Sequence, residues 1–140
     1  MSILSNVDLK NMLNKFNINN VKIMSKDEDY DNPYNKYIIN LDNSNNPGTH
    51  WVGLIDNYYF DSYGLPAPIN IIKHLNNKYY MNDIQYQFLH TSNCGWFVLY
   101  FFIYFKNKKI NKNSYNTFLE QFNILNNNDE IIINQILNNI

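Results

Sequence analysis

Cys94 is the only cysteine of this 140-residue chain, and its type and position raise the possibility of a nucleophile. A lone thiol is commonly a small apolar core residue. Here it directly precedes an apolar run, Trp96 to Phe105, which predicts a helix buried on most sides. A thiol in the first turn of a helix lies at the positive end of the helix dipole, which favours the reactive thiolate. Gly95 beside it would let a substrate backbone approach closely. Both readings, core thiol and nucleophile, stay open at this point.

A nucleophilic thiol needs a base, and the chain offers three histidines. His74 falls on a predicted surface helix and His90 in a predicted loop, so we expect both to be structural or exposed. Two histidines without a matching carboxylate motif make a poor zinc site, and we expect no metal and no cofactor. His50 begins a predicted strand and is followed at once by Trp51. His50 is therefore the candidate base.

A predicted hairpin supplies the group that would orient this base. If residues 56–57 form a two-residue turn, Ile55 pairs with Tyr58. Side chains alternate along each strand, so this register places His50 and Asp61 on the same face as diagonal neighbours. The spacing therefore predicts a Cys–His–Asp triad, an arrangement suited to nucleophilic attack on a carbonyl carbon.

The elements that position these residues follow from the hydrophobic period and from turn signals. Alternating residues predict strands over 37–41, 49–56, 58–61 and 84–89, with a short strand at 21–24 and a loop over 43–48. Helical spacing predicts helices over 5–16, within 64–78, over 94–105, and near 114–122 and 129–137. Strands and helices in this order are typical of an α+β fold. With 45% apolar residues, we expect a single domain over residues 1–140.

Charge and composition narrow the class of protein. The chain has 11 basic residues, all of them lysine, against 12 acidic residues, which argues against a protein that grips nucleic-acid phosphates. The single cysteine suits a reducing compartment, the N-terminus lacks a signal-peptide pattern, and the longest apolar run is too short to cross a bilayer. We therefore expect an intracellular protein that does not enter membranes. Heavy use of Asn, Ile, Lys and Tyr is typical of A/T-rich genomes, such as those of large DNA viruses.

Taken in chain order, the motifs GTHW, FDSYG, Gln87 and SNCG resemble the adenain-like and ubiquitin-like-protein-specific cysteine proteases. This superfamily includes peptidases of adenoviruses, virophages and Polinton-type elements, together with the eukaryotic deSUMOylating enzymes. The resemblance runs from residue 48 to about residue 105. It implies a papain-like or adenain-like core, in which a small mixed sheet packs on a buried central helix that carries the nucleophile at its N-terminus.

Carried over to this chain, the resemblance assigns a role to each candidate residue. His50 would be the general base, Asp61 its orienting carboxylate and Cys94 the nucleophile. Gln87, seven residues before the cysteine, would form the oxyanion hole with the Cys94 backbone N–H. Gln85 lies on the same face of the predicted strand, so alternation alone leaves both glutamines open as donors. Trp51 matches the aromatic residue beside the catalytic pair, and with Gly95 it would contact the substrate.

The resemblance further implies a cysteine endopeptidase that cleaves after glycine in small-residue sequences. Together with the A/T-rich composition, it suggests a protease that matures capsid-type precursors in the host cytoplasm or viral factory, or inside the virion. A peptide activator would have to bind noncovalently, because the chain has no second cysteine. Two alternatives stay open: an isopeptidase specific for ubiquitin-like or SUMO-like modifiers, and a non-enzymatic interaction module with a protease-like fold.

Overall fold

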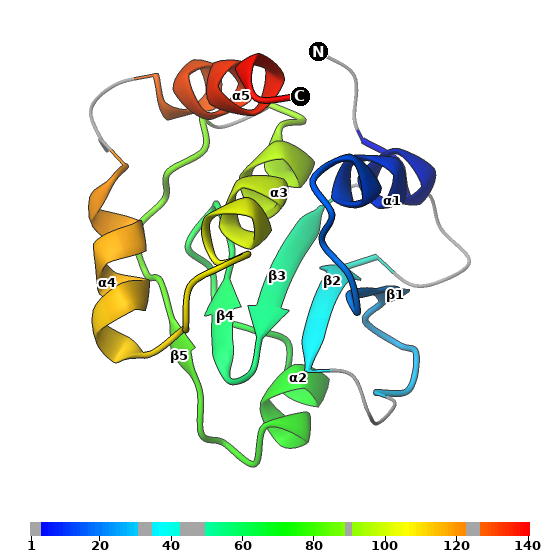
Figure 1. The fold of residues 1–140 in the computed structure, drawn as a ribbon. Helices are drawn as coiled ribbons and strands as arrows, with labels where there is room; N and C mark the ends of the chain where they lie inside the picture. The colour runs from blue at the N-terminus through cyan, green and yellow to red at the C-terminus, as the bar shows by residue number, and fades with distance from the viewer. Residues whose placement is uncertain (1–3, 31–34, 43–49, 89–90, 123–126) are drawn as a thin grey trace.

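A computed structural model describes residues 4–30, 35–42, 50–88, 91–122 and 127–140. Over these ranges the chain forms five helices and a five-stranded sheet (Figure 1). In chain order the elements are α1 (Asn6–Lys15), β1 (Lys22–Ser25), β2 (Lys36–Asn40), β3 (Trp51–Ile55), β4 (Tyr58–Phe60), α2 (Ile69–His74), β5 (Tyr80–Met81), α3 (Cys94–Tyr104), α4 (Lys112–Glu120) and α5 (Asn128–Asn138). The predicted α+β class is confirmed. The predicted loop over 43–48 lies outside the described residues, as do Thr49, Leu89 and His90.

The sheet is mixed, and its strand order follows the chain from β1 to β5. The inner pairs β2–β3 and β3–β4 are antiparallel, whereas the outer pairs β1–β2 and β4–β5 are parallel. In the β3–β4 hairpin Ile55 pairs with Tyr58, as the two-residue turn predicts. Asp56 takes a φ of 52° in that turn, a left-handed conformation that aspartate tolerates better than most residues. The predicted register is therefore confirmed.

The two faces of the sheet pack against different helices. Ile38, Ile55 and Phe60 belong to the larger core, which also contains buried residues of α1, α3, α4 and α5. Their neighbours Tyr37 and Leu54 point the other way, into a smaller core closed by α2. This alternation is the period of two that places successive side chains on opposite faces. Figure 1 shows α3 lying across the sheet, with its first turn near α5.

Helix α3 rests directly on β3. A Cβ atom added to Gly53 would lie 2.8 Å from Phe101 Cδ2, so only a glycine lets the helix come this close without displacing that ring. The helix is apolar on almost every side, as the sequence predicts, and eight of its residues are buried. Because α3 crosses the middle of the sheet, its first residue, Cys94, comes to the end of the sheet where β3 begins.

The strand predicted over 84–89 is wrong for residues 84–88, which form no strand. The backbone N–H groups of Tyr86 and Gln87 both donate to a single acceptor, the Ser62 carbonyl, at 2.8 and 3.1 Å. A regular ladder would give each N–H its own acceptor at alternating positions. Tyr86 and Gln87 are both buried while Gln85 is exposed, so the assumed alternation fails here. On the side of β4 away from β3, the pairing strand is β5, which ends three residues before residue 84.

Candidate active site

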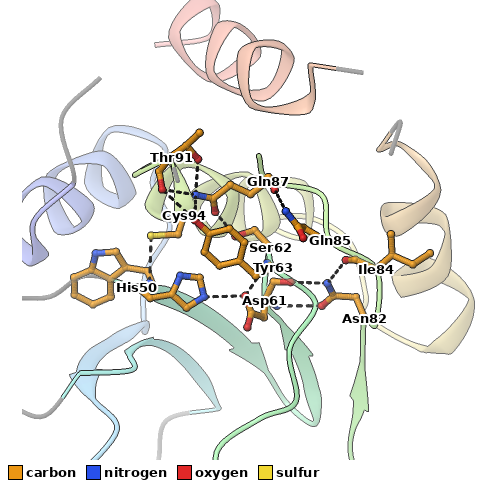
Figure 2. A network of polar contacts seen from close by, with 11 residues as sticks. His50, Asp61, Ser62, Tyr63, Asn82, Ile84, Gln85, Gln87, Thr91 and Cys94 are labelled. Atoms are coloured by element: carbon orange, nitrogen blue, oxygen red, sulfur yellow. Dashed lines mark hydrogen bonds and ion pairs between the residues drawn. The ribbon is translucent and has the colours of Figure 1, made fainter. Parts of the chain in front are cut away.

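The hairpin and the central helix bring three predicted side chains together at one end of the sheet. His50 directly precedes β3, Asp61 directly follows β4, and Cys94 is the first residue of α3. The His50 Nε2 atom lies 2.8 Å from Asp61 Oδ1. In Figure 2 the His50 ring lies between the side chains of Asp61 and Cys94. Cys94 thus shares one site with two residues that lie 33 and 44 positions earlier in the sequence.

Asp61 is held by its backbone as well as by its carboxylate. Its backbone N–H donates to Asn82 Oδ1 at 3.0 Å, and its carbonyl accepts from Asn82 Nδ2 at 2.5 Å. The Oδ1 atom accepts from the Tyr63 backbone N–H at 2.8 Å in addition to His50. Asp61 is 0% exposed, and within the described part of the chain its Oδ2 atom has no hydrogen-bond partner. A buried carboxylate of this kind needs a nearby positive charge, and the His50 ring can supply it.

The environment of His50 favours its charged form. Burial lowers the pKa of His50, but the hydrogen bonds to Asp61 and Cys94, and the negative charges on both groups, raise it more, from 6.5 to about 9. Because Nε2 must carry a hydrogen to bond to an ionised Asp61, Nδ1 is the ring nitrogen left for the sulfur. Nδ1 is buried and makes no hydrogen bond among the residues that the structure describes. The imidazole therefore sits as an imidazolium beside a sulfur near neutral pH.

The Cys94 sulfur lies where negative charge is stabilised. The Trp51 backbone N–H donates to Sγ at 3.4 Å, from the first residue of β3. The residue before the helix, Asn93, makes no side-chain cap, and its amide donates to Asp129 Oδ2 at 2.9 Å. The positive end of the helix dipole is therefore directed toward the sulfur without a capping side chain in between. Cys94 is only 2% exposed, so a substrate must displace a covering group to reach it.

Gln87 lies near Cys94, but its amide is already engaged. The Nε2 atom donates to Thr91 Oγ1 at 2.8 Å and lies 3.1 Å from the Thr91 carbonyl and 3.2 Å from Tyr63 Oη. Its Oε1 atom accepts from Ser62 Oγ at 2.6 Å. Gln85 is exposed and donates to the Gln87 carbonyl at 2.8 Å, so its side chain points away from the buried network. Gln87 is thus the better placed of the two glutamines, and its oxyanion role requires that it release one hydrogen from Thr91 or Tyr63.

Two residues of the FDSYG motif have contacts that the sequence reasoning missed. The Tyr63 ring stacks on the His50 imidazole, with centroids 4.9 Å apart, and its Oη donates to the Thr91 carbonyl at 3.1 Å. Ser62 is fully buried and bonds to Gln87. Their position next to Asp61 in the motif was a usable signal. No comparable signal marks Asn82, which holds the Asp61 backbone from the far side (Figure 2).

The predicted substrate contacts, Trp51 and Gly95, lie beside the nucleophile and both touch Leu4. The Trp51 Nε1–H donates to the Leu4 carbonyl at 2.9 Å. A Cβ atom added to Gly95 would lie 3.1 Å from Leu4 Cβ. Gly95 therefore permits a close approach to its backbone, and in this structure the side chain that approaches it is Leu4. A contact with substrate stays a prediction for both residues.

The remaining sequence candidates lie apart from this site. His74 ends α2, where it stacks on Tyr30 with centroids 4.2 Å apart, and burial lowers its pKa. His90 lies outside the described residues. In the ranges that the structure describes, no cluster of three or more His, Cys, Asp or Glu side chains is placed to hold a metal ion. None of the described helices is both long and apolar enough to span a bilayer.

Comparison with known proteins gives no independent assignment. No protein-family model matches the chain, and no curated protein matches it.

Proposed function

We propose that this protein is a thiol endopeptidase whose catalytic residues are Cys94, His50 and Asp61. One observation carries the proposal: His50 lies 2.8 Å from the fully buried Asp61 carboxylate and next to Cys94, the only cysteine of the chain, at the start of a buried helix. A core thiol would need neither a charged imidazole beside it nor a fully buried carboxylate behind that imidazole. Such a costly arrangement is typical of functional sites.

The geometry supports the following sequence of steps. The Cys94 thiolate attacks the scissile carbonyl carbon, and the carbonyl oxygen becomes an oxyanion near the first turn of α3. The Cys94 backbone N–H and the Gln87 amide donate hydrogen bonds to this oxyanion. His50⁺ then protonates the leaving amine, and the C–N bond breaks to give a thioester. His50, now neutral, takes a proton from water, which hydrolyses the thioester and releases the thiolate. Asp61 keeps Nε2 protonated throughout, so that Nδ1 exchanges the proton.

The substrate class follows from the resemblance of the motifs rather than from a bound ligand. Adenain-like and ubiquitin-like-protein-specific proteases cleave after glycine, and the close packing around Trp51 and Gly95 suits a substrate backbone that lacks bulky side chains. With the A/T-rich composition, this favours a maturation protease for capsid-type precursors of a virus or virus-like element. Its place of action would be the infected cell or the particle.

The test measures both the thiol and the peptide bond. Alkylation of Cys94 by iodoacetamide near neutral pH should be faster than that of free cysteine, because the thiolate is paired with His50⁺. His50→Ala should slow this alkylation, whereas the matched change His74→Ala, on α2, should leave it unchanged. A peptide containing a Gly-Gly or Ala-Gly site should be cleaved by the parent protein and not by Cys94→Ala.

Each alternative has its own outcome in the same experiment. Turnover of a ubiquitin-like C-terminal reporter, without cleavage of the Gly-Gly and Ala-Gly peptides, would replace the maturation protease by an isopeptidase. Alkylation of Cys94 no faster than that of free cysteine, with no turnover of any peptide, would leave a non-enzymatic module with a buried thiol.

A further inference from the structure

Asp129, in the first turn of α5, forms hydrogen bonds with the segment of the chain that leads to Cys94, although it lies 35 positions after that cysteine. Its Oδ1 atom accepts from the Phe88 backbone N–H at 3.0 Å. Its Oδ2 atom accepts from Asn93 Nδ2 at 2.9 Å and lies 3.1 Å from Thr91 Oγ1, whose single hydrogen is shared between Asp129 and the Phe88 carbonyl at 3.0 Å. The carboxylate is only 6% exposed. One buried acidic side chain therefore fixes three points of the chain that leads into Cys94.

Two of these three points lead directly to proposed catalytic groups. Thr91 is the residue whose hydroxyl and carbonyl hold the Gln87 amide. Asn93 immediately precedes Cys94, and its side-chain amide donates to Asp129. Asp129 itself is in contact with neither the sulfur nor the imidazole in any of these bonds.

Helix α5 is anchored firmly enough to act as a support. Ile132, Ile133 and Ile136 on its inner face are buried in the larger core together with α3. The neighbouring Asn128 donates to the Tyr86 carbonyl at 3.3 Å, so α5 holds the chain on both sides of Gln87. A side chain that is held by packing and hydrogen bonds can in turn hold a catalytic group in its productive geometry.

We propose that Asp129 is a positioning residue that sets the oxyanion donors, acting on Gln87 through Thr91 and on the first turn of α3 through Asn93. This inference rests on the proposed hydrolase function for its kinetic consequence. Its structural content, the orientation of the Gln87 amide, does not depend on that function.

The experiment compares Asp129→Asn with Glu130→Gln. The asparagine keeps the size of the side chain and an acceptor for the Phe88 N–H, but it turns an NH₂ group toward the Asn93 amide, so donor meets donor. Glu130 is exposed in the same turn of α5, and its substitution removes the same charge. Three quantities are measured: kcat and KM for a Gly-Gly peptide, the alkylation rate of Cys94, and the side-chain NH₂ resonances of Gln87, assigned by their loss in Gln87→Ala.

For Asp129→Asn we expect the Gln87 resonances to shift and kcat to fall about 10- to 100-fold, as for a misplaced catalytic group. KM and the alkylation rate should stay within about twofold of the parent, because the His50–Cys94 pair is untouched. Glu130→Gln should change none of the three quantities. If Asp129→Asn does not fold, Asp129→Glu keeps the charge but lengthens the side chain by one methylene group, and it should shift the same resonances, with a smaller fall in kcat.

Three outcomes would overturn the inference. Unchanged Gln87 resonances together with an unchanged kcat would show that Asp129 does not position the amide. A parallel fall of kcat, alkylation rate and melting temperature would assign Asp129 to fold stability alone. If the parent hydrolyses no peptide, the proposed function is wrong. The positioning role of Asp129 is then tested by the Gln87 resonances alone, and it is wrong as well if Asp129→Asn does not shift them.

Discussion

The His50 imidazole is the residue on which the chemistry depends, because two neighbours favour its charged form. Asp61 binds Nε2 from a fully buried position, and Cys94 lies beside the same ring. Tyr63 stacks on the imidazole and limits its contact with water. The partners of His50 outweigh the cost of its burial, so its pKa is raised to about 9 and the ring is charged near neutral pH.

The first prediction at this scale concerns the charge of Asp61. Asp61→Asn keeps an acceptor for Nε2 but removes the charge that favours the imidazolium, so kcat/KM for a Gly-Gly peptide should fall at least about 100-fold. Asp56→Asn is the matched control, since it makes the same change in the turn of the same hairpin, where Asp56 is exposed. The control should stay within about twofold of the parent. Equal effects of the two variants would contradict a special role for Asp61.

The second prediction concerns the titration of the imidazoles. In an NMR titration, His50 should have a pKa of about 9, because Asp61 and Cys94 raise it despite burial. In Cys94→Ser the pKa of His50 should be lower, since a serine hydroxyl carries no negative charge near neutral pH. His74 is an internal control of opposite sign, because burial lowers its pKa below 6.5. A His50 midpoint at the ordinary value of 6.5 would contradict the ion pair.

At the scale of elements, the site depends on where the β3–β4 hairpin and α3 end. The hairpin could be predicted because a two-residue turn and strand alternation leave one register, in which Ile55 pairs with Tyr58. Helix α3 could be predicted because an apolar run of its length has to be buried. These two elements suffice to bring His50, Asp61 and Cys94 together.

The segment 84–88 shows what the sequence does not reveal. Its residues alternate like a strand, yet its backbone is satisfied by the Ser62 carbonyl and by the side chains of Asn128 and Asp129. The last two residues lie about forty positions later in the chain, and local pattern carries no information on such contacts. For the same reason, neither Asn82 behind Asp61 nor Leu4 beside Gly95 could be predicted.

A prediction for α2 tests whether the smaller core matters for stability. Ile71 is fully buried against the sheet, whereas Ile69 in the same helix is 70% exposed. Ile71→Ala should lower the free energy of unfolding by about 2–4 kcal/mol through lost burial and a residual cavity. Ile69→Ala should change it by no more than about 0.5 kcal/mol. Urea denaturation measures both, and similar losses for the two variants would show that α2 does not close this core.

At the scale of the whole molecule, the sheet separates a large aromatic core from a small one. The site lies at one end of the sheet, where Cys94 and Trp51 belong to the larger core. The larger core contains buried residues from four helices, so α3 is fixed on several sides. The larger core therefore supports the groups proposed to be catalytic. The interaction between His50 and Asp61 should therefore contribute to the free energy of unfolding of the whole protein.

The dependence of stability on pH should reveal this link. Folded His50 has a pKa of about 9, above the 6.5 of an unperturbed imidazole, so its proton stabilises the fold fully below about pH 6.5. This contribution is lost as the pH rises through about 9. Between about pH 7 and pH 10 the free energy of unfolding should fall more in the parent than in His50→Gln. Parallel curves from urea denaturation would contradict the link.

The contact of Leu4 with Trp51 and Gly95 has a consequence for the surroundings of the nucleophile. Leu4 reaches the nucleophile from the start of the chain, and its carbonyl holds the indole that follows His50. Substitution of Leu4 by a smaller residue would therefore remove packing next to Gly95, although Leu4 lies 90 positions before the nucleophile in the sequence, and it would alter the surroundings of the sulfur.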